Sequence, residues 1–330
     1  MNMKHLSNFK MSSGPSSMEI RQAAASDKES VICIHGNVYD GLDYIAEYFD
    51  DFLACPLTTP YVAVVQNKIV GFIATFIVDQ GKTVITRAGR LSASVGGQGL
   101  YKQFQAHVLK MSGTSRHAFT ALNTNPAANK ETFRAVNKLI LSKPLTRFLF
   151  DAHVLQSLEE SRKKTLNNPS DEDIKHFFSS PAIRKYLFPK ERIIVDWVPY
   201  RLTEANISLL CWSGKRTKVF SDISVDTDGS VRGLLTFSTI IPVKRPAYNC
   251  NFDIYGTDTA TLKDHVISHM RYIRVKTIDS TSLLVLVEPD FNIHALEDVF
   301  REIGMQRSEW RDSENPDNIY SYQLLFEKEI

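Results

Sequence analysis

The sequence lacks several features that would assign a chain to a protein class at once. No apolar run reaches the roughly 18 residues of a membrane-spanning helix, so no membrane segment is expected. Basic residues form no cluster and the net charge is only +2, so we expect neither a nucleic-acid partner nor a membrane partner. The four cysteines have no paired spacing, which favours reduced thiols in a cytoplasmic protein over disulfides or a zinc site: Cys33, Cys55, Cys211 and Cys250.

The first 18 residues also lack the apolar core of a secretory signal. They are polar and rich in serine, and we expect a disordered tail over 1–18. No acidic residue precedes Glu19, which leaves a mitochondrial presequence as the alternative, but the segment contains no arginine.

Two kinds of chemical signature are absent as well. The chain contains no Gly-x-Ser-x-Gly motif and no evident Cys/His nucleophile pair. Among its nine histidines, His265 and His269 are four residues apart and could share a helix face, but no third ligand accompanies them. We therefore expect no bound metal.

What is present is a pattern of short strands and helices in a chain long enough for two domains. The expected elements of the first half are a strand at 19–24, two helices, a three-stranded antiparallel meander over 61–93 with turns at Asn67-Lys68 and Gln80-Gly81, a helix from Leu100, a strand over 117–124, and a helix after Asn125-Pro126. This order predicts an α/β (α+β) fold built around a mixed, mostly antiparallel sheet flanked by helices.

The second half partly repeats this order. Strands are expected over 192–200, 233–241, 248–256, 282–289 and 319–330, with helices over 261–273 and 295–305. A charged segment broken by Asn-Asn-Pro precedes them and is the best linker candidate. We divide the chain into a tail (1–18), a first domain (19–150), linker or bridging helices (151–185) and a second, diverged domain (186–330).

The most informative stretch is "SVGGQGLYKQFQAHV", residues 94–108, which places Gly96, Gly97 and Gly99 between a strand and a helix. A helix start carries unpartnered N–H groups and a positive partial charge, and glycines just ahead of it let an oxyanion approach closely. The alternative is a tight turn that only needs positive φ. Three glycines together favour the site for a phosphate or pyrophosphate. A dinucleotide fold would place the loop in a parallel βαβ unit, and a P-loop would end in Gly-Lys-Ser/Thr, so neither applies.

This layout, with "GGQGLYKQF", resembles the Arg/Gln-x-x-Gly-x-Gly/Ala signature of the GNAT superfamily of acyl-CoA-dependent N-acyltransferases. Gly99 matches the signature glycine, whereas Gly96 stands where the family has Arg or Gln and Tyr101 where Gly or Ala is usual. The resemblance implies that the turn binds the pyrophosphate of acetyl-CoA, the acyl donor. The implied donor-binding residues are Leu91, Ala93, Gly96, Gly97, Gln98, Gly99, Leu100, Tyr101 and Asn125.

A narrower resemblance runs through most of the chain. "VYDGLDYIAEYFDDFL", "IVDQGKTV", "VDWVPY", "FDIYGTD" and "LLFEKEI" are similar to segments of the histidine N-acetyltransferase family. That family has an N-terminal GNAT half and a diverged C-terminal half. The resemblance implies tandem GNAT-like halves and acetylation of a small amine, with the α-amino group of L-histidine as the specific expectation.

The catalytic residues implied by the resemblance are Arg90, Leu91 and Tyr101. In the superfamily, backbone amides of the strand before the glycine turn hold the pantetheine arm and the thioester carbonyl, which here assigns the amides around Arg90 to Ala93. Related enzymes often carry a glutamate base on this strand, but this chain has Arg87, which cannot accept a proton at neutral pH. The usual tyrosine acid is replaced by Phe133, so Tyr101 or water would protonate the thiolate.

Residues for the acceptor are expected in "YDGLDY" and in the second half: Tyr39, Asp43, Tyr44, Arg87, Trp197, Tyr200 and Tyr255. Asp43 could hold an ammonium or imidazolium between two tyrosines, or it could simply cap a helix. Arg87 could pair with the carboxylate of an amino acid, or lie exposed on a sheet edge. The second-half aromatics could line the acceptor pocket or pack in the core.

The turn "YGTDTATL" of the second half has one glycine instead of three, and we expect that half to bind no coenzyme. Two other functions stay open at this point. The acceptor could be another amino acid, a polyamine or a protein N-terminus. The chain could also be a catalytically silent acyl-CoA-binding protein.

Overall fold

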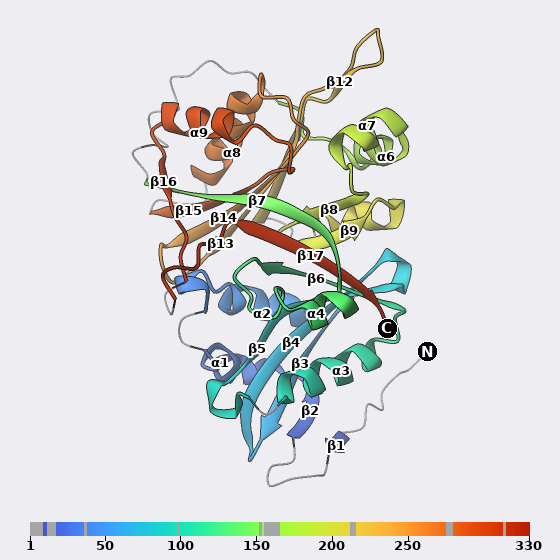
Figure 1. Ribbon diagram of the computed structural model, residues 1–330, viewed down its shortest axis with the longest axis vertical. Coiled ribbons are helices and arrows are strands. Elements are labelled where there is room, and N and C mark those ends of the chain that lie inside the picture. Colours follow the sequence, from blue (N-terminus) through green and yellow to red (C-terminus); the bar gives the residue numbers. More distant parts are fainter. Residues whose placement is uncertain are drawn as a thin grey trace. The chain divides into compact units, whose positions relative to one another are not determined.

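The computed structural model describes residues 9–11, 18–35, 38–97, 99–151, 154, 166–211, 216–274, 280–312 and 315–330. Most of the expected tail, much of the expected linker, and Gln98 lie outside the described residues. Contacts group the chain into two units (Figure 1). The first contains Met1–Val38, Asp43–Phe119 and Lys328–Ile330, and the second contains Tyr39–Leu42 and Thr120–Glu327.

The sheet of the first unit is a meander closed by one parallel strand. Its strands are β1 (Phe9–Met11), β2 (Met18–Gln22), β3 (Thr58–Val65), β4 (Lys68–Val78), β5 (Thr83–Leu91) and β6 (Arg116–Leu122), hydrogen-bonded in that order. Neighbours from β1 to β5 are antiparallel, and β5 with β6 is parallel. The expected meander is confirmed, with its first turn one residue earlier, at Gln66-Asn67, where both residues have positive φ as a tight hairpin requires.

Helices pack on both faces of this sheet. The helical segments of the unit are η1 (Ala25–Asp27), α1 (Lys28–Ile32), α2 (Ile45–Ala54), η3 (Asp79–Gly81), η4 (Ala93–Val95) and α3 (Leu100–Ser112). Phe49 and Phe52 of α2 contact Phe72 of β4, whereas Phe104 of α3 shares a core with Ile73. Because adjacent strand residues point to opposite faces, α2 and α3 cover opposite sides of β4.

The second unit is built around a longer mixed sheet. Its strands follow the order β17 (Tyr322–Glu329), β7 (Lys138–Phe150), β15 (Thr281–Leu286), β14 (Tyr248–Tyr255), β13 (Leu235–Pro242) and β10 (Thr217–Ser221), and β16 (Gln306–Ser308) also pairs with β7. Among the described strands of this unit, β14 and β15 are the pair that runs parallel, and α8 (Leu262–Arg274) lies between them in the chain. The second unit therefore repeats the strand–helix–strand arrangement of β5, α3 and β6.

The two faces of this sheet are covered differently (Figure 1). Helices α8 and α9 (Ile293–Glu302) bury an apolar core against Cys250, Phe252 and Ile254 of β14. The alternate residues of β14 face the hairpin of β8 (Arg192–Val195) and β9 (Val198–Arg201), as Tyr255 shows by hydrogen-bonding to Ile194. The other elements are α4 (Glu131–Val136), α6 (Asp171–Ser179), α7 (Pro181–Leu187), η6 (Glu204–Leu209), β11 (Ser224–Val225) and β12 (Val231–Arg232).

The expected fold class is confirmed, because each unit has a mixed, mostly antiparallel sheet flanked by helices. Two local predictions were wrong, and one strand was not predicted. The stretch 192–200 is a hairpin rather than one strand, because Asp196 and Trp197 adopt positive φ and reverse the chain. The helix expected directly after Asn125-Pro126 begins at Glu131. Strand β7 was not anticipated at all.

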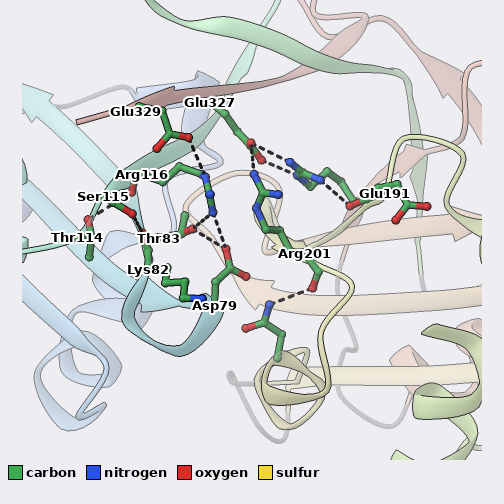
Figure 2. Close-up of polar contacts among 12 residues, drawn as sticks. Asp79, Lys82, Thr83, Thr114, Ser115, Arg116, Glu191, Arg201, Glu327 and Glu329 are labelled. Carbon is green, nitrogen blue, oxygen red and sulfur yellow. Dashed lines mark hydrogen bonds and ion pairs between the residues drawn. The ribbon is translucent and has the colours of Figure 1, made fainter. Parts of the chain in front are cut away.

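Charged pairs fix the last strand of the chain in each unit (Figure 2). In the first unit, Arg116 lies between Asp79 and Glu329, with nitrogen–oxygen distances of 3.9 and 3.3 Å. In the second unit, Glu327 accepts two hydrogen bonds from Arg192, at 2.5 and 2.8 Å, and one from Arg201 at 2.9 Å.

A buried imidazole makes the first unit sensitive to acid. The Nε2 atom of His117 is 2.9 Å from the hydroxyl of Thr86, and the ring stacks on Phe119. Burial, with Lys328 nearby, lowers the pKa of His117 to about 3. An unfolded histidine titrates near pH 6.5, so the neutral ring stabilises the fold above that pH and the contribution is lost as the pH falls from 6.5 toward 3.

We expect His117→Gln to flatten this acid-side loss of stability, by up to about 1.4 kcal/mol per pH unit. Denaturant titrations of parent and variant between pH 7 and pH 4 measure the difference in slope. The exposed His294, replaced by Gln, is the control. Parallel curves for the parent and His117→Gln would contradict a neutral, buried His117.

Candidate active site in the first unit

The glycine turn adopts the conformation that its composition predicts. Gly97 and Gly99 have φ of 77° and 70°, in the left-handed region that favours glycine. A Cβ atom at either position would meet nothing within 4 Å, so open space lies beside both. Gly99 is the N-cap of α3 and offers no side-chain cap to the first N–H groups of the helix. The space beside Gly97 and Gly99, at the start of α3, is therefore not crowded by other residues.

Strand β5, which leads into this turn, carries a bulge. Its register with β4 pairs Phe72 with Arg90 but Ala74 with Arg87, which leaves one extra residue on β5. Ala88 has φ of 54°, uncommon for a residue other than glycine. The pairing of β5 with β6 runs from Thr83–Arg116 to Ile85–Ala118. The bulge therefore lies beyond that pairing, in the half of β5 where the sequence predicts a site for an acyl group.

Two predicted site residues, Asp43 and Arg90, meet at the bulge. The carboxylate of Asp43 accepts two hydrogen bonds from the Arg90 guanidinium, at 2.6 and 2.9 Å. Asp43 also accepts from the backbone N–H of Ile45 at the start of α2, so the expected helix-capping contact is present. The Arg90 side chain is only 4% exposed, and its Nε donates to the carbonyl of Ala88 at 3.3 Å. A two-point charged pair thus joins the start of α2 to the bulge.

The predicted tyrosines complete this arrangement. The backbone N–H of Ala88 donates to the Tyr44 hydroxyl at 3.1 Å. Both backbone polar groups of Ala88 are therefore bonded, the N–H to Tyr44 and the carbonyl to Arg90. The hydroxyl of Tyr101 would lie 2.3 Å from a Cβ at Gly89, which means that it rests directly on the β5 backbone. Tyr101 as a whole is 36% exposed, although its hydroxyl lies against Gly89. Burial, with Tyr44 nearby, raises the pKa of Tyr101 to about 12, so the hydroxyl keeps its proton.

Arg87 is buried on the same strand, 6% exposed, which excludes the solvent-exposed edge position. Its guanidinium carbon lies 5.3 to 5.9 Å from the ring centroids of Tyr48, Tyr44 and Phe52. Aromatic faces attract a cation at this range. Asp43, Tyr44, Arg87, Arg90 and Tyr101 are thereby gathered around the second half of β5.

The remaining acceptor candidates, and Asn125, lie in the second unit. Tyr39 is exposed and has φ of 52° in η2 (Val38–Gly41), and Asn125 accepts from the backbone N–H of Ala127 as the cap of a turn. Tyr200 and Tyr255 are buried, and their hydroxyls bond to backbone groups of Leu209 and Ile194. Trp197 lies at the β8–β9 turn and donates from Nε1 to Asn251 at 3.3 Å. Contact of these residues with a substrate stays a prediction.

His265 and His269 do share a face of α8, but their ring nitrogens are engaged in hydrogen bonds. Thr236 lies 2.8 Å from one nitrogen of each ring. The second nitrogen of His265 pairs with Asp222 at 3.1 Å, and that of His269 with Ser238 at 2.7 Å. Burial lowers the pKa of His269 well below its usual range, so its ring is neutral. In the described part of the chain, no three His, Cys, Asp or Glu side chains are grouped as metal ligands.

A search of the described helices finds none with the length and apolarity to cross a bilayer.

Comparison with known proteins gives matches over both halves of the chain. The family described as "Histidine N-acetyltransferase, C-terminal" matches residues 162–287. The human protein named "Probable N-acetyltransferase 16" is 22% identical over 269 residues, which cover 76% of this chain and 71% of that protein. The histidine N-acetyltransferase of Xenopus tropicalis is 21% identical over 266 residues, covering 75% of this chain and 78% of the frog protein.

Solved structures share the fold. A protein from Pyrococcus horikoshii assigned as an acetyltransferase superposes with a TM-score of 0.54 at 10% identity, covering 100% of this chain and 94% of that one. The N-myristoyltransferase of Saccharomyces cerevisiae, solved with bound myristoyl-CoA, superposes with a TM-score of 0.51 at 12% identity, covering 94% and 78%. At sequence identities this low, the superpositions show that these proteins share the fold of this chain.

Proposed function

We propose that this chain, a GNAT-type N-acetyltransferase similar to the histidine N-acetyltransferases, transfers the acetyl group of acetyl-CoA to the α-amino group of L-histidine. One observation carries the proposal. The Tyr101 hydroxyl rests on the bulge of β5, at the end of the strand that leads into the glycine turn. Along the chain, a hydroxyl that would act as proton donor, a bulged strand and a glycine turn that would bind an anion are therefore brought to the end of β5 and the start of α3.

The donor end of the site would be the glycine turn with the start of α3. The open space beside Gly97 and Gly99 lets a pyrophosphate reach the backbone N–H groups without meeting a side chain. Acetyl-CoA fits this position because its pyrophosphate is doubly charged and its pantetheine arm, which ends in the thioester, can extend along β5. The yeast N-myristoyltransferase, which has the same fold, was solved with an acyl-CoA bound.

The reaction would proceed by attack of the neutral amine nitrogen on the thioester carbonyl carbon. Backbone amides of Arg90, Leu91 and Ala93 would stabilise the negative charge that develops on the carbonyl oxygen. The attacking nitrogen then carries an extra proton, which it would lose to water. The carbon–sulfur bond breaks, and Tyr101 would give its proton to the departing thiolate and regain one from water. Asp43 holds Arg90 and therefore acts in this scheme through the shape of the bulge, as a positioning residue.

Histidine as the acceptor is supported by the names of the relatives and by the matched C-terminal family. The test is to incubate the purified full chain with acetyl-CoA and single amino acids while following free thiol. Thiol release with L-histidine, and formation of N-acetylhistidine by mass spectrometry, is the expected result. Thiol release with another amine alone would identify that amine as the acceptor in place of histidine. Coenzyme binding without thiol release would overturn the enzymatic proposal.

The role of the glycine turn has a matched test on α3 itself. Gly99 caps the start of the helix with φ of 70°, and Gly113 caps its end with φ of 65°. Neither has a neighbour within 4 Å of a Cβ, so Gly99→Ala and Gly113→Ala impose the same backbone strain, about 1 kcal/mol each. We expect only Gly99→Ala to weaken acetyl-CoA binding, about tenfold, because its methyl group occupies the phosphate side. Equal affinities measured by calorimetry would place the phosphates elsewhere.

A further inference from the structure

A row of buried polar side chains crosses the sheet of the second unit. We call Lys143 of β7, Gln323 of β17, Glu288 just after β15, and Asn249 and Asp253 of β14 the buried polar row. Gln323 lies opposite Lys143 in the sheet register, and the Lys143 ammonium is 3.5 Å from a Glu288 oxygen. These five side chains are between 0% and 5% exposed. Charge at such depth is rare unless it is paired or binds something.

The tip of the β8–β9 hairpin lies on this row. The backbone N–H of Asp196 donates to Asp253 at 3.2 Å, and the Asp196 carboxylate accepts from Asn251 at 2.8 Å. Asp196 and Trp197 have φ of 52° and 65°, so the tip is a left-handed turn without glycine. Such backbone strain persists where surrounding contacts enforce it, and it concentrates at functional sites. Two segments in which the sequence predicts acceptor residues, "VDWVPY" and "FDIYGTD", therefore meet at the row.

Every member of the row has a polar atom that lacks a hydrogen-bond partner among the described residues. These atoms are Nζ of Lys143, Oε1 of Glu288, Oδ1 of Asp253, Oδ1 of Asn249, and both amide atoms of Gln323. Besides its ion pair with Glu288, the Lys143 ammonium lies 3.9 Å from the centroid of the Tyr255 ring. Buried polar groups are nearly always satisfied, and leaving one unsatisfied is unfavourable. Several such atoms together point to a binding site for a polar ligand.

The charges and hydrogen-bonding groups of the row indicate which class of ligand it would bind. Asp253 and Glu288 can accept hydrogen bonds from an ammonium, and Lys143 and Gln323 can donate to a carboxylate. Two carboxylates and one ammonium leave an excess of negative charge. Burial, only partly offset by Lys143, raises the pKa of Asp253 to about 7 and raises the pKa of Glu288 as well. A ligand with a net positive charge would offset the unfavourable free energy of burying these two carboxylates.

We propose that the buried polar row binds a free α-amino acid, with Asp253 and Glu288 on its α-ammonium group and Lys143 and Gln323 on its α-carboxylate. The identity of that amino acid as histidine rests on the proposed function. The excess negative charge of the row favours a cationic side chain. The row thus distinguishes a free amino acid from a polyamine, which has no carboxylate for Lys143.

The test uses the full chain with coenzyme A present, which carries no acetyl group to transfer. L-Histidine, histidinol (no carboxylate) and imidazole-4-propionate (no α-amine) are titrated by calorimetry. We expect each analogue to bind about 10- to 100-fold more weakly than L-histidine. Because the ligand changes and the protein does not, this comparison is independent of folding. No binding of L-histidine, or equal binding of the three ligands, overturns the proposal.

Variants then assign the two ends of the ligand. Lys143→Met should weaken L-histidine about tenfold and leave histidinol unchanged, whereas Glu288→Gln and Asp253→Asn should weaken L-histidine and leave imidazole-4-propionate unchanged. Lys175→Met, which removes the partner of Glu204 at the surface, is the control. If the ligand preferences stay the same in all three row variants, the row is not the site. That failure differs from failure of the proposed function, in which the thiol assay gives no acetyl transfer to histidine.

Discussion

Asp43→Ala is expected to remove most of the acetyl-transfer activity and to destabilise the first unit by about 3–5 kcal/mol, because it leaves a buried guanidinium without its carboxylate. The Arg90 side chain is 4% exposed and donates two hydrogen bonds to Asp43. Removing one partner of a buried ion pair lowers the free energy of unfolding far more than removing an exposed ion pair does. Urea unfolding measures the stability, and the thiol assay measures kcat and KM.

The expected loss of activity follows from the place of this pair in the site. Arg90 donates to the carbonyl of Ala88, and Tyr44 accepts from its N–H, so the peptide group on each side of the bulge is held from the start of α2. Without Asp43, the Arg90 side chain is free to turn, and the amides of Arg90 and Leu91, which directly follow the bulge, lose the geometry needed at the thioester. Misplacement of catalytic groups by about 1 Å can slow a reaction by about 100-fold.

Asp43→Asn separates positioning from stability. The amide oxygen can still accept from Ile45 and from one Arg90 nitrogen, so we expect a smaller loss of stability, about 1.5–3 kcal/mol, with a fall in kcat at nearly unchanged KM for acetyl-CoA. Asp50→Asn is the control on the same helix, since the pair of Asp50 with Lys28 is exposed. If both asparagine variants behave alike, Asp43 does not position the bulge.

The fold of the first unit could be predicted because its signals are local. Period-two alternation and turn residues mark β3 to β5, and the glycines mark the start of α3. Strand β7 escaped because it contains Pro144, which ordinarily argues against an interior strand. In the sheet, the Pro144 carbonyl accepts a hydrogen bond from the backbone N–H of Val287, and the next residue, Leu145, donates to the carbonyl of Ser321. That arrangement depends on the partner strands, which no local pattern identifies.

The site could be predicted as a set of residues but not as a set of contacts. The segments "YDGLDY" and "TRAGRLSA" were both assigned to it, yet the Asp43–Arg90 pair joins positions 47 residues apart. The sequence left Asp43 free to bind a substrate ammonium, whereas in the fold its carboxylate is taken by Arg90. Gly89 could not be assigned to the site from the sequence, since a lone glycine in a strand has many explanations. The buried polar row was missed because Lys143 and Asp253 lie in otherwise apolar strands, where a sequence pattern suggests only an exposed face.

Gly89→Ala is expected to reduce kcat about 100-fold, because its methyl group would lie 2.3 Å from the Tyr101 hydroxyl. That separation is impossible, so either the tyrosine or the bulge must move, at a cost of about 1–3 kcal/mol. The backbone at Gly89 does not need positive φ, so the effect comes from crowding alone. Kinetics with acetyl-CoA and L-histidine, alongside thermal unfolding, measure the two consequences.

The double variant Gly89→Ala/Tyr101→Phe shows whether crowding is the cause. Without the hydroxyl, the nearest ring atoms lie 3.4 and 3.6 Å from the new methyl group, which is van der Waals contact. We therefore expect the double variant to regain the stability lost in Gly89→Ala, with a coupling energy of about 1 kcal/mol or more. It should not regain activity, because Tyr101→Phe alone removes the proton donor and should lower kcat about 100-fold. Full activity in Tyr101→Phe would assign the proton to water and leave the hydroxyl a purely structural contact with β5.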